Sequence, residues 1–201
     1  MGSLSVMTGA KIGSNPQNRF GTEQITIDHA AKALASFERT LLSGNSPFDK
    51  FEAGGDGKAI SASAKRGVPI FRQKGRCNLC HSGFNFTDDL YHNLGIGMDK
   101  PEGPRDLGRY AVTRRERDRG AFKTPTLREI GRTAPYMHDG RFWTLEEVVD
   151  FYDKGGIRNP NLSLLMRELN LTAQEKRDLI AFLKTLDGEG WQHLSKPPLF
   201  P

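Results

Sequence analysis

The chain has 201 residues and a mass of 22.4 kDa, which is the size of one ordinary domain. Apolar residues make up 36% of the sequence, and no run of them approaches the roughly 18 that a membrane span needs. The net charge of +5 is moderate, and no block of Lys and Arg stands unmixed with acidic residues. The composition therefore indicates neither a membrane span nor a nucleic-acid-binding protein, and the positive charge suits docking to an acidic partner protein.

The N-terminal residues 1–24 carry Gly, Ser, Asn, Pro and Gln without apolar periodicity, so an arm, or the remnant of a preceding domain, is predicted there. The segment lacks the charged start, apolar core and cleavage site of a signal peptide. From about Thr26 to Ser43, apolar residues recur at three- and four-residue steps, which predicts an amphipathic helix that ends at Gly44. Residues 45–49 are predicted to form a turn.

A second helix is predicted over about 63–74, and it leads the chain into residues 77–81. Pro69 lies inside this helix and should kink it, because proline lacks the backbone N–H that a helix interior uses. Residues 83–132 show little periodicity and many Gly, Pro, Asp and Arg residues. A stretch of this length without regular structure is uncommon unless it has a function, such as wrapping a cofactor.

Two capping boxes mark the starts of the last predicted helices. One opens a helix over 144–153 and the other a helix over 172–186, each with Thr at the N-cap and Glu three residues later. No segment shows a convincing strand pattern. The predicted fold class is all-α, with one helical domain over 25–188, long loops, and a C-terminal tail over 189–201.

Residues Cys77-Asn78-Leu79-Cys80-His81 form the C-x-x-C-H signature of c-type haem attachment. Two thiols at this spacing can add to the two vinyl groups of one porphyrin, and His81 then reaches the iron as its proximal ligand. The alternatives are half of a zinc site, a redox dithiol or a structural disulfide. No second Cys or His pair follows at zinc-finger spacing, and no strand–helix context surrounds the dithiol, so the pattern favours haem.

A haem iron takes a second protein ligand in an electron carrier, and keeps an open or exchangeable position where it reacts with peroxide. The candidates for a second ligand beyond the motif are Met98, Met137, Tyr152, Met166, His92 and His138. From composition alone, methionine is the favoured second ligand in an electron-transfer cytochrome, which points to Met98 or Met137. Each of them can also be a flexible apolar side chain that fills space against the porphyrin or the core.

Three segments resemble the bacterial di-haem cytochrome c peroxidase family, to which MauG also belongs: Phe122–Arg128, Thr133–Gly140 and Trp143–Val149. Together with the motif upstream, the similarity runs from near Phe20 to the C-terminus. Family members have two cytochrome c-like domains, each with its own C-x-x-C-H. This sequence has one such motif and resembles only the C-terminal domain. The resemblance implies a cytochrome c-like helical domain whose loops wrap one haem, without the peroxide-reacting haem and acid–base glutamate of the N-terminal domain.

The resemblance also implies an axial ligand by position. In the peroxidases, a methionine on the helix that follows residues 135–143 binds the C-terminal haem, and Tyr152 stands at that place here. MauG has a tyrosine there too, so Tyr152 is predicted to bind the iron, with Met137 as the runner-up. A phenolate favours ferric and higher-valent iron, whereas a thioether favours ferrous iron and raises the potential. A bound tyrosine therefore points toward MauG-like oxidation.

Four further residues have predicted supporting roles. Lys123 and Arg128 flank a Thr-Pro-Thr turn, where they can pair with the haem propionates or face solvent. The resemblance implies a calcium ion between the two domains, with backbone carbonyl ligands that match Thr133 and Pro135. Its side-chain ligand comes from the N-terminal domain, so this chain would hold a partial calcium site.

The leading functional hypothesis is the haem c domain of a di-haem peroxidase-type oxidoreductase, MauG-like or cytochrome c peroxidase-like, with electron transfer through one covalent haem. The alternative is a free-standing mono-haem cytochrome that only carries electrons. A non-haem redox or zinc module is the third hypothesis. The expected partner is a redox protein or the N-terminal haem domain. The expected location is the periplasm, because covalent haem attachment in bacteria takes place outside the cytoplasm.

Overall fold

The computed structural model describes residues 21, 24–98 and 106–192. The chain forms two compact units, one of residues 43–189 and one of residues 1–42 with 190–201. The domain boundaries that the sequence places at residues 25 and 188 stay predictions. The predicted arm and the predicted tail lie almost wholly outside the described residues.

Helix α2 (Ile27–Glu38) begins where the sequence predicts and ends earlier than predicted. Thr26 is its N-cap, because the Thr26 hydroxyl accepts a hydrogen bond from the His29 N–H and the His29 ring accepts one from the Thr26 N–H. The helix ends at Arg39, in an ordinary right-handed conformation, without the left-handed residue that the sequence places at Gly44. Local chemistry therefore fixes the start of this helix more firmly than its end.

Helix α3 (Pro47–Glu52) lies where the sequence predicts only a turn. Ser46 is its N-cap and forms a capping box with Asp49, whose carboxylate accepts from the Ser46 N–H at 2.9 Å. Pro47 occupies the first helical position, where its missing N–H does no harm. The turn prediction was wrong because a helix of six residues is too short to show apolar periodicity.

Helix α4 (Ala62–Pro69) continues into a π-helical turn (Ile70–Lys74), which confirms the helix predicted over about 63–74. The helix type changes at Pro69, as expected for a residue with no N–H to donate to the preceding turn. The wider turn closes with the Gly75 N–H donating to the Ile70 carbonyl at 2.7 Å. This segment brings the chain directly into the C-x-x-C-H motif.

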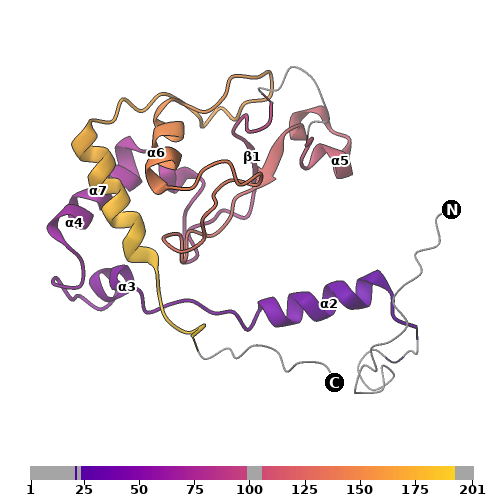
Figure 1. The fold of residues 1–201 in the computed structure, drawn as a ribbon, viewed down its shortest axis with the longest axis horizontal. Coiled ribbons are helices and arrows are strands. Elements are labelled where there is room, and N and C mark those ends of the chain that lie inside the picture. The colour runs from indigo at the N-terminus through magenta and orange to yellow at the C-terminus, as the bar shows by residue number, and fades with distance from the viewer. Residues whose placement is uncertain (1–20, 22–23, 99–105, 193–201) are drawn as a thin grey trace. The chain divides into compact units, whose positions relative to one another are not determined.

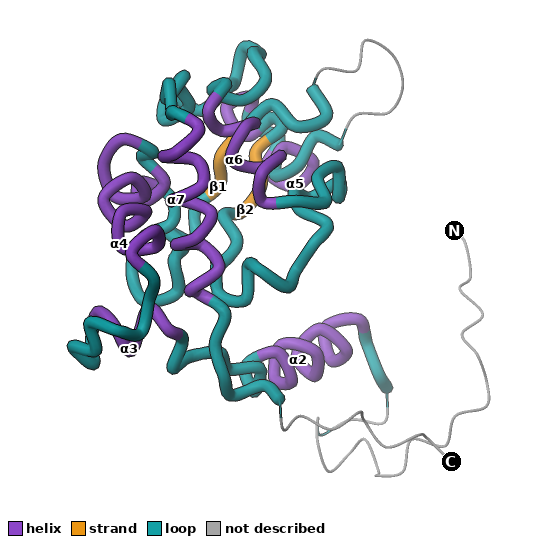
Figure 2. Tube along the Cα trace, turned by 60° about the vertical axis from the view of Figure 1, so that its left-hand side comes forward, coloured by secondary structure: helices purple, strands orange, loops and turns teal. Residues whose placement is uncertain are grey.

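Both predicted capping boxes are present. They open helix α6 (Leu145–Asp153) and helix α7 (Ala173–Leu183), and a 3₁₀ turn (Lys184–Leu186) extends α7. In each box the threonine hydroxyl accepts from the glutamate backbone N–H at 3.2 Å. Helix α7 runs alongside α4 and also contacts α6 (Figure 1, Figure 2). Helix α7 therefore packs against the helix that precedes the motif, and α6 packs against α7.

Helices α4 and α7 approach each other closely at Gly67. A Cβ atom at this position would overlap the Asp178 carbonyl oxygen and would lie 2.7 Å from the Cβ of Phe182. Only glycine permits such an approach of two backbones. The Arg66 side chain adds a charged bond to the same contact, with its Nε 2.8 Å from Asp178 Oδ2. This contact holds the helix that leads into the motif against α7.

A two-stranded antiparallel sheet pairs β1 (Tyr91–Asn93) with β2 (Ala121–Lys123), and His92 lies opposite Phe122. The sequence indicates no strand, because three residues are too few to show an alternating pattern. A short helix, α5 (Tyr110–Thr113), lies between the strands in the sequence. The described part of the chain is therefore helix-rich with one small sheet, and the all-α prediction misses that sheet.

Aromatic rings form the centre of the core in residues 43–189. The rings of Phe48 and Phe71 lie with their centroids 5.1 and 5.0 Å from that of Phe182 on α7. Phe86, from the loop after the motif, lies 6.1 Å from Phe71. Cys77 packs partly against this cluster. The core therefore supports the motif directly.

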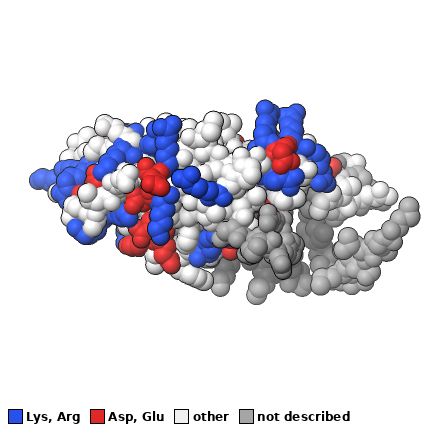
Figure 3. Space-filling model, turned by 90° about the horizontal axis from the view of Figure 1, so that it is seen from above, with Lys and Arg blue, Asp and Glu red and all other residues white. Residues whose placement is uncertain are grey.

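Over the described ranges, no helix is long and apolar enough to cross a bilayer. Figure 3 shows basic and acidic side chains next to one another on one face. Ion pairs also join segments that are distant in sequence, as between Lys74 and Glu175 at 2.6 Å. The surface seen in that view is of mixed charge, which agrees with the moderate net charge of the sequence.

Candidate haem site

The C-x-x-C-H motif occupies a tight turn after the π-helical segment. Arg76 enters the turn with a φ of 54°, and residues 77–79 form a short 3₁₀ helix. The His81 N–H donates to the Cys77 carbonyl at 2.8 Å. Cys77 and Cys80 are half-buried free thiols. The turn thus holds two sulfur atoms and an imidazole on one short, hydrogen-bonded piece of backbone.

Both thiols are protonated at neutral pH. Burial raises the pKa of Cys77 to about 12, and the charge of Cys80 contributes to the rise. Burial also raises the pKa of Cys80 to about 11, with a contribution from the charge of Asp88. A redox dithiol needs the opposite shift, since its attacking sulfur works as a thiolate near neutral pH. The environment of these cysteines therefore disfavours a thioredoxin-like role.

The His81 ring is oriented by a hydrogen bond from its Nδ1 atom. Its Nδ1 lies 3.0 Å from the Phe86 carbonyl oxygen, which can only accept a hydrogen bond, so Nδ1 carries the proton and donates. Burial lowers the pKa of His81, which keeps the imidazole neutral. A neutral imidazole with a protonated Nδ1 presents the lone pair of Nε2, which is the atom that a metal binds.

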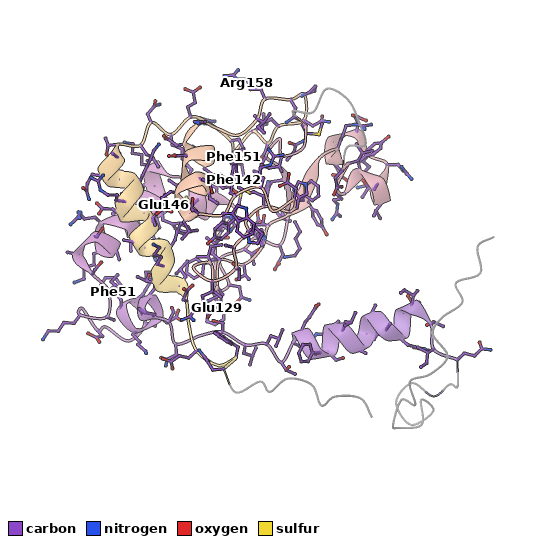
Figure 4. The ribbon with its side chains drawn as sticks, in the orientation of Figure 1. Phe51, Glu129, Phe142, Glu146, Phe151 and Arg158 are labelled. Carbon is purple, nitrogen blue, oxygen red and sulfur yellow. The ribbon has the colours of Figure 1, made fainter. Side chains whose placement is uncertain are left out.

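Tyr152 reaches the motif from the last turn of α6. Its half-buried ring packs edge-on against Phe151 at 5.6 Å, and Phe151 lies 5.5 Å from Phe142 (Figure 4). Burial raises the pKa of the Tyr152 phenol, and the charges of Cys77 and Cys80 raise it further. Because such an effect falls with distance, these two contributions indicate that α6 turns the phenol toward the motif. The fold brings together residues that are far apart in the sequence.

This set of donors fits a covalently attached haem. The group needs two thiols for its vinyl substituents and one or two axial donors for its iron. His81 offers a neutral nitrogen from the motif, and Tyr152 offers a phenol oxygen from α6, close to both cysteines. The proximity of the phenol supports Tyr152 as the second ligand, and its ligation stays a prediction.

The methionine candidates occupy other places. Met98 lies against Gly120, just before β2, with its sulfur 3.1 Å from where a Cβ atom would stand at that glycine. Met137 has a positive φ of 70° and lies in the turn between Tyr136 and Phe142, whose backbones pair. The turn is adjacent in sequence to α6, and ligation by Met137 remains the alternative to Tyr152.

Arg128 and Lys123, the two residues predicted to pair with propionates, both contact carboxylates of the chain itself. The buried Arg128 guanidinium forms a two-point ion pair with Asp49, at 2.6 and 3.0 Å, and also donates to the Phe84 carbonyl at 2.8 Å. The exposed Lys123 lies 2.6 Å from Asp89. A propionate would have to share these cations with their carboxylates, so the propionate role stays a prediction.

A pocket of about 610 Å³ opens beside the motif. Its lining includes Asn78 and His81 from the motif, Phe48 from α3, and Arg128. The lining contains neither cysteine and not Tyr152. The pocket places aromatic and basic groups next to His81.

Thr133 and Pro135 are exposed residues of the loop that precedes Tyr136. Calcium binding at their carbonyls stays a prediction. Asp88 and His92 lie beside Cys80. The sequence offers His92 as a candidate axial ligand, but it does not group His92 with Asp88 and Cys80, because three intervening residues outside a helix give no recognisable signal. The Asp88 N–H bond to the Cys80 carbonyl and the pairing of β1 with β2 hold the two residues there.

Comparisons with known proteins agree on one family. The family model for di-haem cytochrome c peroxidase matches residues 6–57, ahead of the motif. The methylamine utilization protein MauG of Methylorubrum extorquens is 46% identical over 176 residues, which cover 86% of this chain and 48% of the relative. The cytochrome-c peroxidase IdrP1 of a Pseudomonas species is 40% identical over 198 residues, covering 85% of this chain and 52% of the relative.

Among solved structures, a MauG-like protein associated with microbial copper homeostasis is similar in fold and sequence. The two share 32% identity with a TM-score of 0.70, over 84% of this chain and 55% of that one. The chain thus spans about half the length of the curated relatives that it matches. It belongs to the di-haem cytochrome c peroxidase and MauG family.

Proposed function

We propose that this chain is the C-terminal haem domain of a di-haem, MauG-like or cytochrome c peroxidase-like oxidoreductase, and that it passes electrons through one covalent haem c. Family membership supports a haem-binding, peroxidase-type oxidoreductase. The single motif at residues 77–81 supports one haem on this chain. A haem bound here would supply a redox-active iron, and the protein supplies its attachment, orientation and ligands.

The proposed roles follow from the geometry of each side chain. Cys77 and Cys80 would hold the haem through two thioether bonds, and the His81 Nε2 would bind its iron. The Tyr152 phenol oxygen would be the second protein ligand, with its proton released to solvent. A phenolate is a hard anionic donor, so it lowers the reduction potential and suits a site that stores oxidising equivalents.

The observation that carries this proposal is the state of His81. A buried, neutral imidazole whose Nδ1 donates to the Phe86 carbonyl is oriented as a metal ligand, and it stands directly after two free thiols. Half of a zinc site or a redox dithiol would not account for the nearby Tyr152 phenol.

Haem retention on a denaturing gel tests this proposal. The chain is produced in a bacterial periplasm with the haem attachment machinery, and haem is detected by its peroxidase stain after electrophoresis. Cys77→Ala and Cys80→Ala should each weaken the stain, because one thioether bond remains, and Cys77→Ala with Cys80→Ala should abolish it. Met137→Leu, which alters no thiol, should leave it unchanged. A mature chain without covalent haem would overturn the proposal.

The alternative function is a free-standing mono-haem electron carrier, and the single C-x-x-C-H of the chain favours it. Steady-state turnover of hydrogen peroxide with a reduced cytochrome as donor separates the two. With His81 and Tyr152 both on the iron, peroxide has no open position to bind, so the chain alone should turn over peroxide very poorly. Rapid turnover by pure single-haem protein would show that one haem suffices, and would retire the two-domain account.

The proposed location is the periplasm, where thioether attachment takes place in bacteria. The proposed partners are a redox protein and an N-terminal haem domain. The matched regions cover 48% and 52% of the two relatives, so these relatives are long enough to contain such a second domain. Calcium binding through Thr133 and Pro135 is proposed only for a protein that contains that second domain.

A further inference from the structure

Three potential metal ligands meet on one side of Cys80. The Cys80 sulfur, an Asp88 carboxylate oxygen and a His92 ring nitrogen all lie within 4.8 Å of one another, and all three residues are half-buried. The His92 Nε2 is 2.7 Å from Asp88 Oδ2. The haem site described above uses the Cys80 sulfur but gives neither Asp88 nor His92 a role.

The backbone holds this group together. The Asp88 N–H donates to the Cys80 carbonyl at 2.8 Å, which ties the loop after the motif back onto the motif itself. The Leu90 N–H donates to Asp88 Oδ1 at 2.9 Å, so that Oδ2 is left to face His92. His92 is in strand β1, opposite Phe122 of β2. Each ligand therefore has a fixed backbone position before any metal binds.

The donor atoms select the kind of metal. Thiolate, imidazole and carboxylate together are ligands of zinc, and three protein ligands leave the fourth tetrahedral position for water. Zinc bonds of about 2.3 Å to sulfur and about 2.0 Å to nitrogen or oxygen place the ligand atoms roughly 3 to 4 Å apart. The group therefore needs only small shifts, among them a slight separation of His92 Nε2 from Asp88 Oδ2, which are 2.7 Å apart without a metal. Magnesium and calcium prefer all-oxygen sites and are disfavoured by the sulfur.

The charges of the group also favour a cation. A Cys80 thiolate and an Asp88 carboxylate within 4.8 Å of each other would repel, and a divalent ion removes this repulsion because both groups then face the same positive charge. Binding converts the thiol and the ion into a metal thiolate and releases one proton to solvent.

We infer that the haem-free chain binds one zinc-class divalent cation through Cys80, Asp88 and His92, and that this binding competes with haem attachment at Cys80. The competition rests on the proposed function, whereas the binding does not. A thioether is neutral and no longer an anionic ligand, so a chain with haem attached loses the site. The metal would act on the maturation of the protein.

The neighbouring C-x-x-C-H residues offer a different zinc site, and the structure separates the two. The Cys77 sulfur faces the Gly75 carbonyl at 3.3 Å, and the His81 Nδ1 is bonded to Phe86. Neither residue belongs to the group around Asp88, which contains Cys80 alone from the motif. Cys77→Ala therefore serves as the matched control for Cys80→Ala.

The experiment uses the full chain, reduced and haem-free, made in a cytoplasm without attachment machinery. Zinc affinity is measured by competition with a chromophoric chelator, and cobalt is added as a spectroscopic probe for thiolate-to-metal charge transfer. We expect one ion per chain. Cys80→Ala should abolish the charge-transfer band, and His92→Ala and Asp88→Asn should each weaken zinc binding by at least about tenfold, the loss that even outer-shell changes produce. Cys77→Ala should leave affinity and band unchanged.

The site would be overturned if His92→Ala and Asp88→Asn bound zinc as tightly as the unaltered chain. It would also be overturned if Cys77→Ala lost zinc binding. Circular dichroism shows whether each chain is folded. If the haem-free chain folds only when zinc is present, zinc-dependent folding becomes the readout. The site is supported if His92→Ala and Asp88→Asn impair that folding, and refuted if they do not.

Competition is then tested by haem attachment in vitro, which zinc should slow in the unaltered chain and not in His92→Ala. Zinc binding without slowed attachment would refute the competition alone.

Discussion

The Nδ1 atom of His81 lies 3.0 Å from the carbonyl oxygen of Phe86. Phe86 is 8% exposed, belongs to the aromatic core, and has a φ of 52°, which is unusual for a bulky residue. Packing of its ring thus holds the backbone in a conformation that it would not otherwise favour. The carbonyl that orients the His81 imidazole is therefore positioned by the core, so the orientation of His81 depends on how the Phe86 ring packs.

His81→Ala should leave haem attached through the two cysteines while removing its proximal nitrogen ligand. We expect a changed ferric absorption and electron paramagnetic resonance spectrum, together with retained haem on a denaturing gel. His29→Ala, which alters an imidazole on α2, should leave the spectrum unchanged. If His81→Ala retained the spectrum of the unaltered protein, His81 would not be the ligand, and the hydrogen bond to Phe86 would be structural only.

Tyr152→Phe should remove the phenolate character of the ferric spectrum, leave haem attachment intact and raise the reduction potential. The reason is that a ring without its hydroxyl cannot donate the anionic oxygen that stabilises ferric iron. The phenyl ring still packs against Phe151, so the fold should survive. Redox titration of the purified domain, followed by its absorption, provides the measurement.

Met137→Leu is the matched variant for this test, because it removes the alternative sulfur ligand at nearly constant volume. Neither the spectrum nor the potential should change much. The reverse pattern, with a spectrum indifferent to Tyr152→Phe and altered by Met137→Leu, would assign the second axial position to Met137. It would also make this domain a plain electron carrier.

Several elements could be predicted from the sequence because their signals are local. The starts of α6 and α7 were predicted from the Thr-x-x-Glu boxes, and the helix before the motif from its apolar spacing. The motif itself indicated haem from spacing alone. Tyr152 can be predicted as a ligand only from the family resemblance, because no pattern within residues 144–153 indicates an axial ligand.

Other features depend on contacts between distant segments, and such contacts leave no local pattern in the sequence. Asp49, which pairs with Arg128, stood in a segment predicted as a turn. The three-residue strands β1 and β2 are too short for a pattern, yet their pairing places His92 beside Asp88 and Cys80. The close approach at Gly67 likewise cannot be inferred from a lone glycine in a helical segment.

Gly67→Ala should destabilise the domain by about 1–3 kcal/mol, because the new methyl group overlaps the Asp178 carbonyl and helices α4 and α7 must separate. The midpoint of urea unfolding measures the loss. Gly57→Ala is the control, since a Cβ atom at Gly57 meets nothing within 4 Å. Equal midpoints for the two variants would mean that the α4–α7 contact tolerates the extra atom and does not limit stability.

Asp178 should make the stability of the domain depend on pH in the acid range. Its carboxylate is 2% exposed and accepts hydrogen bonds from Ser63 and Gln174 and two from Arg66. The hydrogen bonds from Arg66, then Ser63, lower the pKa of Asp178 from 3.8 to about 2. A carboxyl group with a lowered pKa stabilises the fold above its unfolded pKa, and that contribution is lost as the pH falls through the folded pKa.

Asp178→Asn removes this contribution, and at pH 7 it should lower the free energy of unfolding by about 2 kcal/mol, the scale of a charged hydrogen bond. Because the effect belongs to the ionised carboxylate, the difference between the unaltered chain and the variant should shrink as the pH falls from about 4 to about 2. Urea unfolding at several pH values, at fixed ionic strength, gives both curves.

Arg66→Gln should reduce the same difference, since the guanidinium is the largest cause of the lowered pKa. A gap between the curves that stayed constant down to pH 2 would show that Asp178 acts by shape and neutral hydrogen bonds, and not by its charge.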